Sequence, residues 1–375
     1  MNNDLALQQF YTAVYRTNKG NVDGIKLGLS LLETGDFQQR WEVAKLFPKL
    51  GKDIIDPLLT VLEDETIEVE YRWFVARILG QFHDEKVIIS LVKLLETTEE
   101  EELLTIIAEA LGNMGISAIN SLEKLLIDDS SKLLVVKALA QIRHSETILP
   151  LLKVVDDPNS NIRAIAIESL GSFHQKQLIP IFSKALNDPA SVVRKEAIIA
   201  LAMQPEFTAE FEIIKQLKPL LYDIDLEVSK QAASALGRIK ASEAIELLSL
   251  VLNKETTPLE LKKEVIKALN WTETAQALDY LKQALWKEEL ELSKMIINLL
   301  GTQTNEILKI KASQILIDFL SSEKAIIQEQ EIKQAIAISV GELGNKMAIN
   351  VLNKLEQDSN KAVQLHAIAA LKKFD

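Results

Sequence analysis

The chain has 375 residues, of which 47% are apolar and only 5% aromatic, and its net charge at pH 7 is −12. This length allows a large continuous core, while the acidic balance argues against non-specific binding to duplex nucleic acid, which needs a basic stripe. The absence of cysteine excludes disulfides, thiolate metal sites and a cysteine nucleophile. No apolar run is long enough for a membrane span and the first residues lack a secretory signal, so we expect a cytoplasmic protein.

Residues 1–35 are expected to form a capping helix pair. Two helical stretches, from about Asp4 to Tyr15 and from Val22 to Leu32, flank a polar turn at residues 18–21. The open end of a stack of repeats exposes apolar surface. A degenerate pair of helices at the N-terminus would cover that surface.

A repeat of about 31 residues continues from there to the end of the chain. It is clearest at residues 156–171, where an Asp-Pro-Asn-Ser turn leads into an amphipathic helix that ends at Gly171, and it recurs at residues 188–202. Equivalent anchor positions in the successive copies are Pro48, Gly80, Gly112, Ala140, Gly171, Ala202, Gly237, Asn270, Gly301, Gly341 and Lys372. The residues one and five before each anchor are apolar in every copy, so both columns share a helix face. The residue two before is small in most copies, which favours close helix packing.

A second helix lies between successive anchors, for example at residues 148–155 and 178–186. Each unit therefore reads as a helix, a short turn, a second helix and an acidic turn. Repetition at this period indicates one supersecondary unit stacked many times. The sequence predicts an all-α fold, an α-solenoid of about eleven helix pairs, without a strand.

The first two repeats carry a duplicated Arg-Trp dipeptide. Arg40-Trp41 and Arg72-Trp73 lie 32 residues apart, and Tyr71 precedes the second. Trp and Arg are enriched in binding hot spots, so we predict a partner-binding patch of Arg40, Trp41, Tyr71, Arg72 and Trp73. The alternative is that both tryptophans point inward and enlarge the N-terminal core.

The spacing from Gly301 to Gly341 is 40 residues, the one large irregularity of the repeat. It predicts a longer helix or an extra turn within residues 307–334. We therefore divide the chain into the capping pair at 1–35, repeats at 36–305 and C-terminal repeats at 306–375, which could form a separate lobe. The last helix, residues 361–374, is a plausible C-terminal cap.

Acidic residues gather in the turns between repeats, as at Asp128-Asp129 and Asp156-Asp157. Negative charge before a helix N-terminus is favourable and supports solubility. The alternative interpretation is an acidic rim that steers a basic partner.

The pattern of an Asp-Pro turn, an aliphatic residue, Arg and then Ala-x-x-Ala-Leu-Gly resembles the HEAT repeat. From about Phe37 to the C-terminus it is most similar to the short HEAT-like class also found in phycobilisome bilin lyases. The resemblance implies an armadillo/HEAT-type superhelix. It also implies a ladder in which the basic residue eight before the anchor contacts a neighbouring turn, as Arg163 would with Asp157 and Arg194 with Asp188.

No catalytic, cofactor-binding or metal-binding residue is predicted. HEAT-like hydroxylases hold iron with His-Glu dipeptides, and none of the four histidines here precedes Glu. Phosphate-loop, nucleophile-elbow and dinucleotide motifs are also absent.

We therefore interpret the chain as a non-enzymatic scaffold or adaptor that binds protein on the concave helix face. We expect it to bind no nucleic acid and no cofactor. The alternative, suggested by the resemblance, is a bilin lyase or lyase-like chaperone of phycobiliproteins.

Overall fold

A computed structural model describes residues 3–16, 22–287 and 289–374. Within these ranges the chain forms α-helices and short 3-10 helices and no strand, as the sequence predicts. The polar turn expected at residues 18–21 lies outside the described residues. The structure divides into two compact units, residues 1–173 and 174–375, and each is described by itself.

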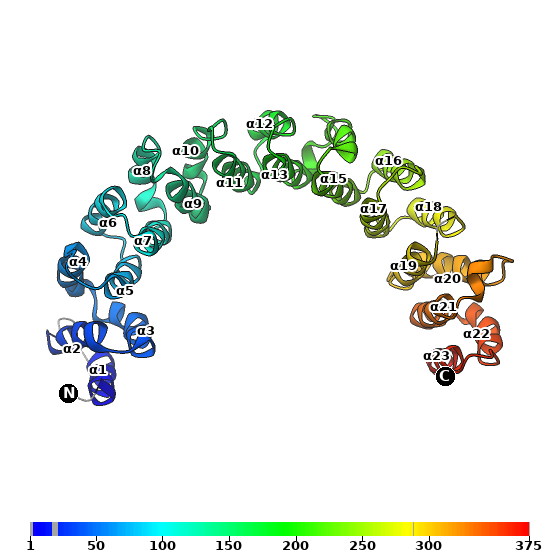
Figure 1. Ribbon diagram of the computed structural model, residues 1–375, viewed down its shortest axis with the longest axis horizontal. Helices are drawn as coiled ribbons and strands as arrows, with labels where there is room; N and C mark the ends of the chain where they lie inside the picture. Colours follow the sequence, from blue (N-terminus) through cyan, green and yellow to red (C-terminus); the bar gives the residue numbers. More distant parts are fainter. Residues whose placement is uncertain (1–2, 17–21, 288, 375) are drawn as a thin grey trace. The chain divides into compact units, whose positions relative to one another are not determined.

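The first unit contains helices α1 to α11. Their bounds are α1 Asn3–Arg16, α2 Val22–Thr34, α3 Phe37–Leu46, α4 Ile55–Glu63, α5 Val69–Leu79, α6 Glu85–Thr97, α7 Glu101–Asn113, α8 Ile116–Leu125, α9 Lys132–Ile142, α10 Ile148–Leu152 and α11 Ser160–Gly171. Each odd-numbered helix packs on the next odd-numbered one, from α1 to α11. The even-numbered helices α4, α6 and α8 pack on one another in a second layer (Figure 1).

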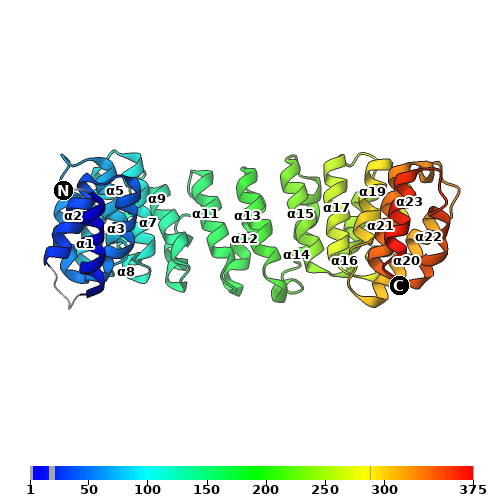
Figure 2. The same cartoon turned by 90° about the horizontal axis from the view of Figure 1, so that it is seen from below.

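The second unit continues the same two-layer arrangement. Its helices are α12 Ile179–Ala185, α13 Ser191–Ala202, α14 Ile213–Leu217, α15 Leu226–Ile239, α16 Ser242–Asn253, α17 Leu259–Trp271, α18 Ala275–Leu285, α19 Leu290–Leu300, α20 Glu306–Leu320, α21 Gln330–Leu343, α22 Ile349–Leu355 and α23 Lys361–Leu371. Figure 2 shows the odd-numbered helices α15 to α23 running side by side in one layer. The chain is thus an α-solenoid, and each predicted anchor lies within two residues of the end of an odd-numbered helix.

The two apolar columns form the core, as the periodicity predicts. Leu79, Leu139 and Leu170, each one before an anchor, have no exposed surface, and neither do Val75 and Val135, each five before. Because these positions differ by four, both point toward the partner layer of helices. The periodicity therefore selected the correct inward face.

The small residues allow odd-numbered helices to approach closely. A Cβ atom placed on Gly80 would lie 2.7 Å from the Cα of Ala110 on α7, and one placed on Gly237 would lie 2.9 Å from the Cα of Ala268 on α17. Each contact joins an anchor to the residue two before the next anchor. A larger side chain at either position would push the two helices apart.

The predicted ladder is confirmed and extends further than expected. The Nη1 atoms of Arg163 and Arg194 donate to the backbone carbonyls of Asp157 and Asp188, both at 2.8 Å. The basic residue eight before the anchor also reaches a carboxylate in the following inter-repeat turn. These pairs are Arg40–Glu68, Lys132–Asp157, Arg194–Asp223 and Lys333–Asp358. The ladder therefore ties successive repeats together and is a structural device.

The long spacing before Gly341 has two sources. Helix α20 is 15 residues long, and the segment that follows it, with the 3-10 helix η7 at Ala325–Gln328, precedes α21. Helix α20 packs on α18 and α21, so the additional length remains within the two-layer arrangement. The domain boundaries at residues 35 and 305 and the separate C-terminal lobe stay predictions.

Candidate partner-binding site

Three of the five residues in the predicted patch lie in the interior. The exposed fractions of Arg40, Tyr71 and Arg72 are 6%, 5% and 4%. Arg40 donates to the carboxylates of Glu68 at 2.9 Å and Glu70 at 2.7 Å. The Nε atom of Arg72 donates to the Leu62 carbonyl at 2.9 Å. These side chains join neighbouring repeats, so the expectation of a surface patch needs correction for all three.

Tyr71 is held inside by a hydrogen bond from its hydroxyl to the Leu29 carbonyl at 3.2 Å. Burial, with a smaller contribution from the charge of Glu33, raises the pKa of Tyr71 to about 12.

The raised pKa of Tyr71 predicts a loss of stability at high pH. Below the unfolded-state pKa of about 10, both states keep the phenol proton and Tyr71 contributes no pH dependence. As pH rises from 10 toward 12, the unfolded state ionises first, so the free energy of unfolding falls by about 2–3 kcal/mol. Urea unfolding at pH 9 and pH 12 for the native chain and Tyr71→Phe measures this. An equal loss in both proteins would contradict the assignment to Tyr71.

Trp41 and Trp73 are each half-buried. They therefore fit neither the prediction of an exposed patch nor the alternative of tryptophans that point fully inward. They border a cluster whose floor is the fully buried Phe74 and whose outer edge is Phe37, which is 58% exposed. The ring of Phe37 stacks on Trp41 with centroids 6.0 Å apart, and Trp73 meets Phe74 edge-to-face at 5.1 Å. Each indole therefore packs partly against the core and remains partly accessible.

Sequence reasoning missed the residue that joins the two tryptophans, which is Arg77 on α5. Its Cζ atom lies 4.5 Å from the Trp41 ring centroid and 5.7 Å from that of Trp73, within the range of cation–π attraction. Arg77 follows Trp73 by four residues, so the helix places both on one face. That spacing was the available signal, although the contact with Trp41 comes from a different repeat. We call Phe37, Trp41, Trp73, Phe74 and Arg77 the aromatic patch.

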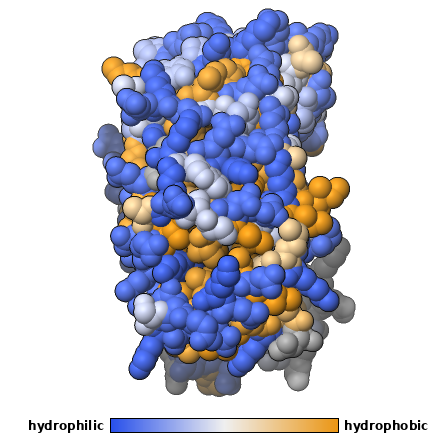
Figure 3. Space-filling view, turned by 90° about the vertical axis from the view of Figure 1, so that its right-hand side faces the viewer, coloured by the Kyte–Doolittle hydropathy of each residue, from blue (hydrophilic) through white to orange (hydrophobic). Residues whose placement is uncertain are grey.

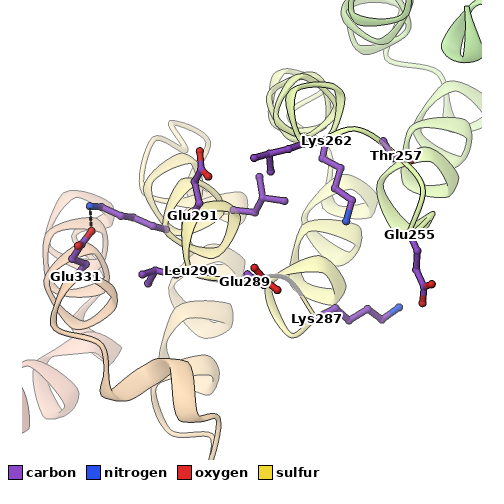
Figure 4. Close-up of a pocket in the computed structure, with 11 residues that line it drawn as sticks. Glu255, Thr257, Lys262, Lys287, Glu289, Leu290, Glu291 and Glu331 are labelled. Atoms are coloured by element: carbon purple, nitrogen blue, oxygen red, sulfur yellow. Dashed lines mark hydrogen bonds and ion pairs between the residues drawn. The ribbon is translucent and has the colours of Figure 1, made fainter. Parts of the chain in front are cut away.

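Other surface features of the described residues have a different character. A cavity of about 710 Å³ lies along the turns that precede α17, α19 and α21 in the second unit (Figure 4). Charged side chains of both signs line it, including Lys262, Glu289 and the ion pair Lys294–Glu331. Those charges are interspersed, and none of the described residues that line the cavity is aromatic. We therefore do not favour it over the aromatic patch.

Apolar residues are also exposed on the side of the second unit where α20 and α22 lie, as Figure 3 shows among mostly hydrophilic neighbours. Ile307 and Ile310 on α20 are 75% and 54% exposed. Exposed aliphatic residues are common on protein surfaces and do not by themselves mark a site. None of the helices in the described ranges is both long enough and apolar enough to cross a bilayer.

The comparisons with known proteins agree with the repeat pattern. The family model described as HEAT repeats matches residues 55–134, 122–202 and 214–301. A curated relative, the uncharacterized phycocyanin operon protein Z of Pseudanabaena tenuis, is 27% identical over 149 residues, which are 39% of this chain and 72% of that protein.

Two solved structures illustrate the range of structural likeness. A structure of Kap95p with RanGDP matches with a TM-score of 0.56 at 13% identity, covering all of this chain and 57% of that one. This likeness concerns the fold alone. Human deoxyhypusine hydroxylase matches with a TM-score of 0.31 at 18% identity, covering 68% of this chain and 95% of that one.

Proposed function

This chain belongs to the HEAT-repeat family, and from that premise we propose that it is a non-enzymatic scaffold or adaptor that binds a protein partner on the layer of odd-numbered helices. We further propose that this layer is the concave face and that the aromatic patch is its main contact. The cytoplasmic location and the acidic rim also stay predictions from the sequence.

The observation that carries this proposal is the accessible part of the aromatic patch. Trp41, Trp73 and Arg77 combine large apolar rings with a planar cation, and interface hot spots are enriched in these residue types. Their support is rigid, because the rings rest on the buried Phe74. Little side-chain entropy would be lost on binding, which favours affinity.

Replacing both tryptophans tests the proposal. Trp41→Ala with Trp73→Ala should remove at least 90% of the protein captured by the native chain, since hot-spot truncations cost about 2 kcal/mol or more each. The measurement is quantitative mass spectrometry of protein retained from a lysate of the organism that encodes the chain. Trp271→Ala, at a residue 45% exposed on α17, is the matched control and should leave capture unchanged. An identical captured set for the double variant would refute the patch as the binding surface.

A second candidate is a bilin lyase or lyase-like chaperone of phycobiliproteins. The relative from a phycocyanin operon favours it, although that protein is itself uncharacterized. The chain would be incubated with an open-chain tetrapyrrole and an apo-phycobiliprotein. A covalent, light-absorbing adduct would support the lyase function. If a known lyase forms the adduct and this chain does not, the result favours the scaffold proposal.

A further inference from the structure

We propose that the aromatic patch recognises an acidic peptide segment, in which one carboxylate pairs with Arg77 and a neighbouring apolar side chain packs on Trp41 and Trp73. This inference rests on the proposed function, because it takes the patch to be the partner surface. It adds the chemistry of the partner.

The first argument is that the guanidinium of Arg77 is oriented but not neutralised. It lies against both indole rings, at 4.5 and 5.7 Å from their centroids. Among the residues that the structure describes, no carboxylate forms an ion pair with it, whereas Arg40 and Arg194 each have one within 2.7 Å. A planar guanidinium presents a fork of N–H donors that matches the two oxygens of a carboxylate.

The second argument is which of the cations near Arg77 can meet a partner. Helices α3 and α5 and the 3-10 helix η1 at Phe47–Leu50 carry five cations and two carboxylates. The cations are Arg40, Lys45, Lys49, Arg72 and Arg77, and the carboxylates are Glu42 and Glu70. Arg40 and Arg72 are buried, and Arg40 pairs with Glu68 and Glu70, so of these five cations a partner would meet Lys45, Lys49 and Arg77.

The third argument is the number of available positive charges. Lys45 already pairs with Glu42 at 3.1 Å, and Lys49 lies over the Tyr15 ring at 4.8 Å. Arg77 is the cation of the patch itself, and no carboxylate among the described residues pairs with it. One guanidinium matches the single charge of a carboxylate, whereas sites for doubly charged phosphate groups generally use a cluster of arginines. The adjacent indoles require an apolar side chain beside that carboxylate.

A pair of synthetic peptides tests the inference. The acidic probe is acetyl-Glu-Asp-Leu-Phe-Glu-amide, and its neutral counterpart replaces each acid by its amide in acetyl-Gln-Asn-Leu-Phe-Gln-amide. Of the four tryptophans in the chain, Trp271 and Trp286 are first changed to Phe, so that fluorescence reports only on Trp41 and Trp73. Titrations at low salt give the dissociation constant of each peptide.

We expect the acidic peptide to change the tryptophan emission and to bind about ten- to a hundredfold more tightly than the neutral one, the range for a charge-assisted hydrogen bond. Arg77→Gln should remove this preference and Arg77→Lys should retain part of it, since Lys keeps the charge without the fork. Arg238→Gln, at an exposed arginine of the second unit, is the matched control and should leave both constants unchanged. Circular dichroism melting of each variant shows that it is folded.

Three results would overturn the inference. Equal affinity for the two peptides would mean that the patch binds only their apolar side chains. The scaffold proposal would then stand without the acidic preference. Tighter binding of a phosphoserine analogue of the acidic peptide would assign the patch to phosphate groups. Binding of neither peptide at millimolar concentration would also reject it, and lysate capture by the Trp41→Ala, Trp73→Ala variant would then decide separately whether the scaffold proposal fails too.

Discussion

Leu170→Ala is expected to lower the free energy of unfolding by about 2–5 kcal/mol. Leu170 lies on α11, one residue before the anchor Gly171, and has no exposed surface. The change removes buried methyl groups and leaves a cavity that the helices of a packed core fill only in part. Urea unfolding monitored by circular dichroism gives the difference.

Leu149→Ala is the matched control for this change. Leu149 lies on the neighbouring α10 and is 70% exposed, so the same truncation there should cost less than about 0.5 kcal/mol. Equal effects at the two positions would mean that the inward face of the repeat has been assigned wrongly.

Asp223→Ala is expected to cost about 3 kcal/mol, because it leaves a largely buried guanidinium without its counter-charge. The side chains of Arg194 and Asp223 are 11% and 9% exposed. Two hydrogen bonds of 2.9 and 2.6 Å join the guanidinium to the two carboxylate oxygens. The Arg194 side chain would keep its contacts with the carbonyls of Asp188 and Pro189, which limits the loss.

A double-mutant cycle of Asp223→Ala and Arg194→Ala measures the interaction energy between these two side chains, apart from their contacts with other residues. A coupling energy above about 1 kcal/mol is expected. Asp56→Ala provides the exposed comparison, because Asp56 pairs with Lys86 at 2.9 Å while both side chains are more than 60% exposed. That change should cost less than about 1 kcal/mol. Equal costs for the buried and the exposed pair would refute the structural importance of the ladder.

Much of the fold was predictable because the same pattern of apolar, small and turn-forming residues recurs in each repeat. The first two expected helices, about Asp4 to Tyr15 and Val22 to Leu32, correspond to α1 at Asn3–Arg16 and α2 at Val22–Thr34. The last expected helix, residues 361–374, ends earlier, at Leu371. Helix ends depend on caps and on packing of the following chain, so periodicity defines them less well than it defines the helix interior.

The candidate site was predictable only in part. The Arg-Trp duplication lies in the region of the proposed patch, whose role in partner binding stays a prediction, and the repeat position that aligns Arg40 with Arg72 also buries both. Position eight before the anchor faces the adjacent turn, as Arg194 and Lys333 confirm. A single sequence does not reveal whether a basic residue at that position meets solvent or the next repeat, because the contact lies about 30 residues away.

The sequence by itself determined the helical repeat, the two apolar columns and the small residues between neighbouring helices, because all three follow from the 3.6-residue period and from side-chain size. Only the tertiary structure decided which arginine meets the tryptophans. Trp41 and Arg77 come from different repeats, and the packing of α3 against α5 brings them within 4.5 Å. That packing also buries Arg40 and Tyr71 while leaving each indole partly accessible, because adjacent residues of a helix point in different directions.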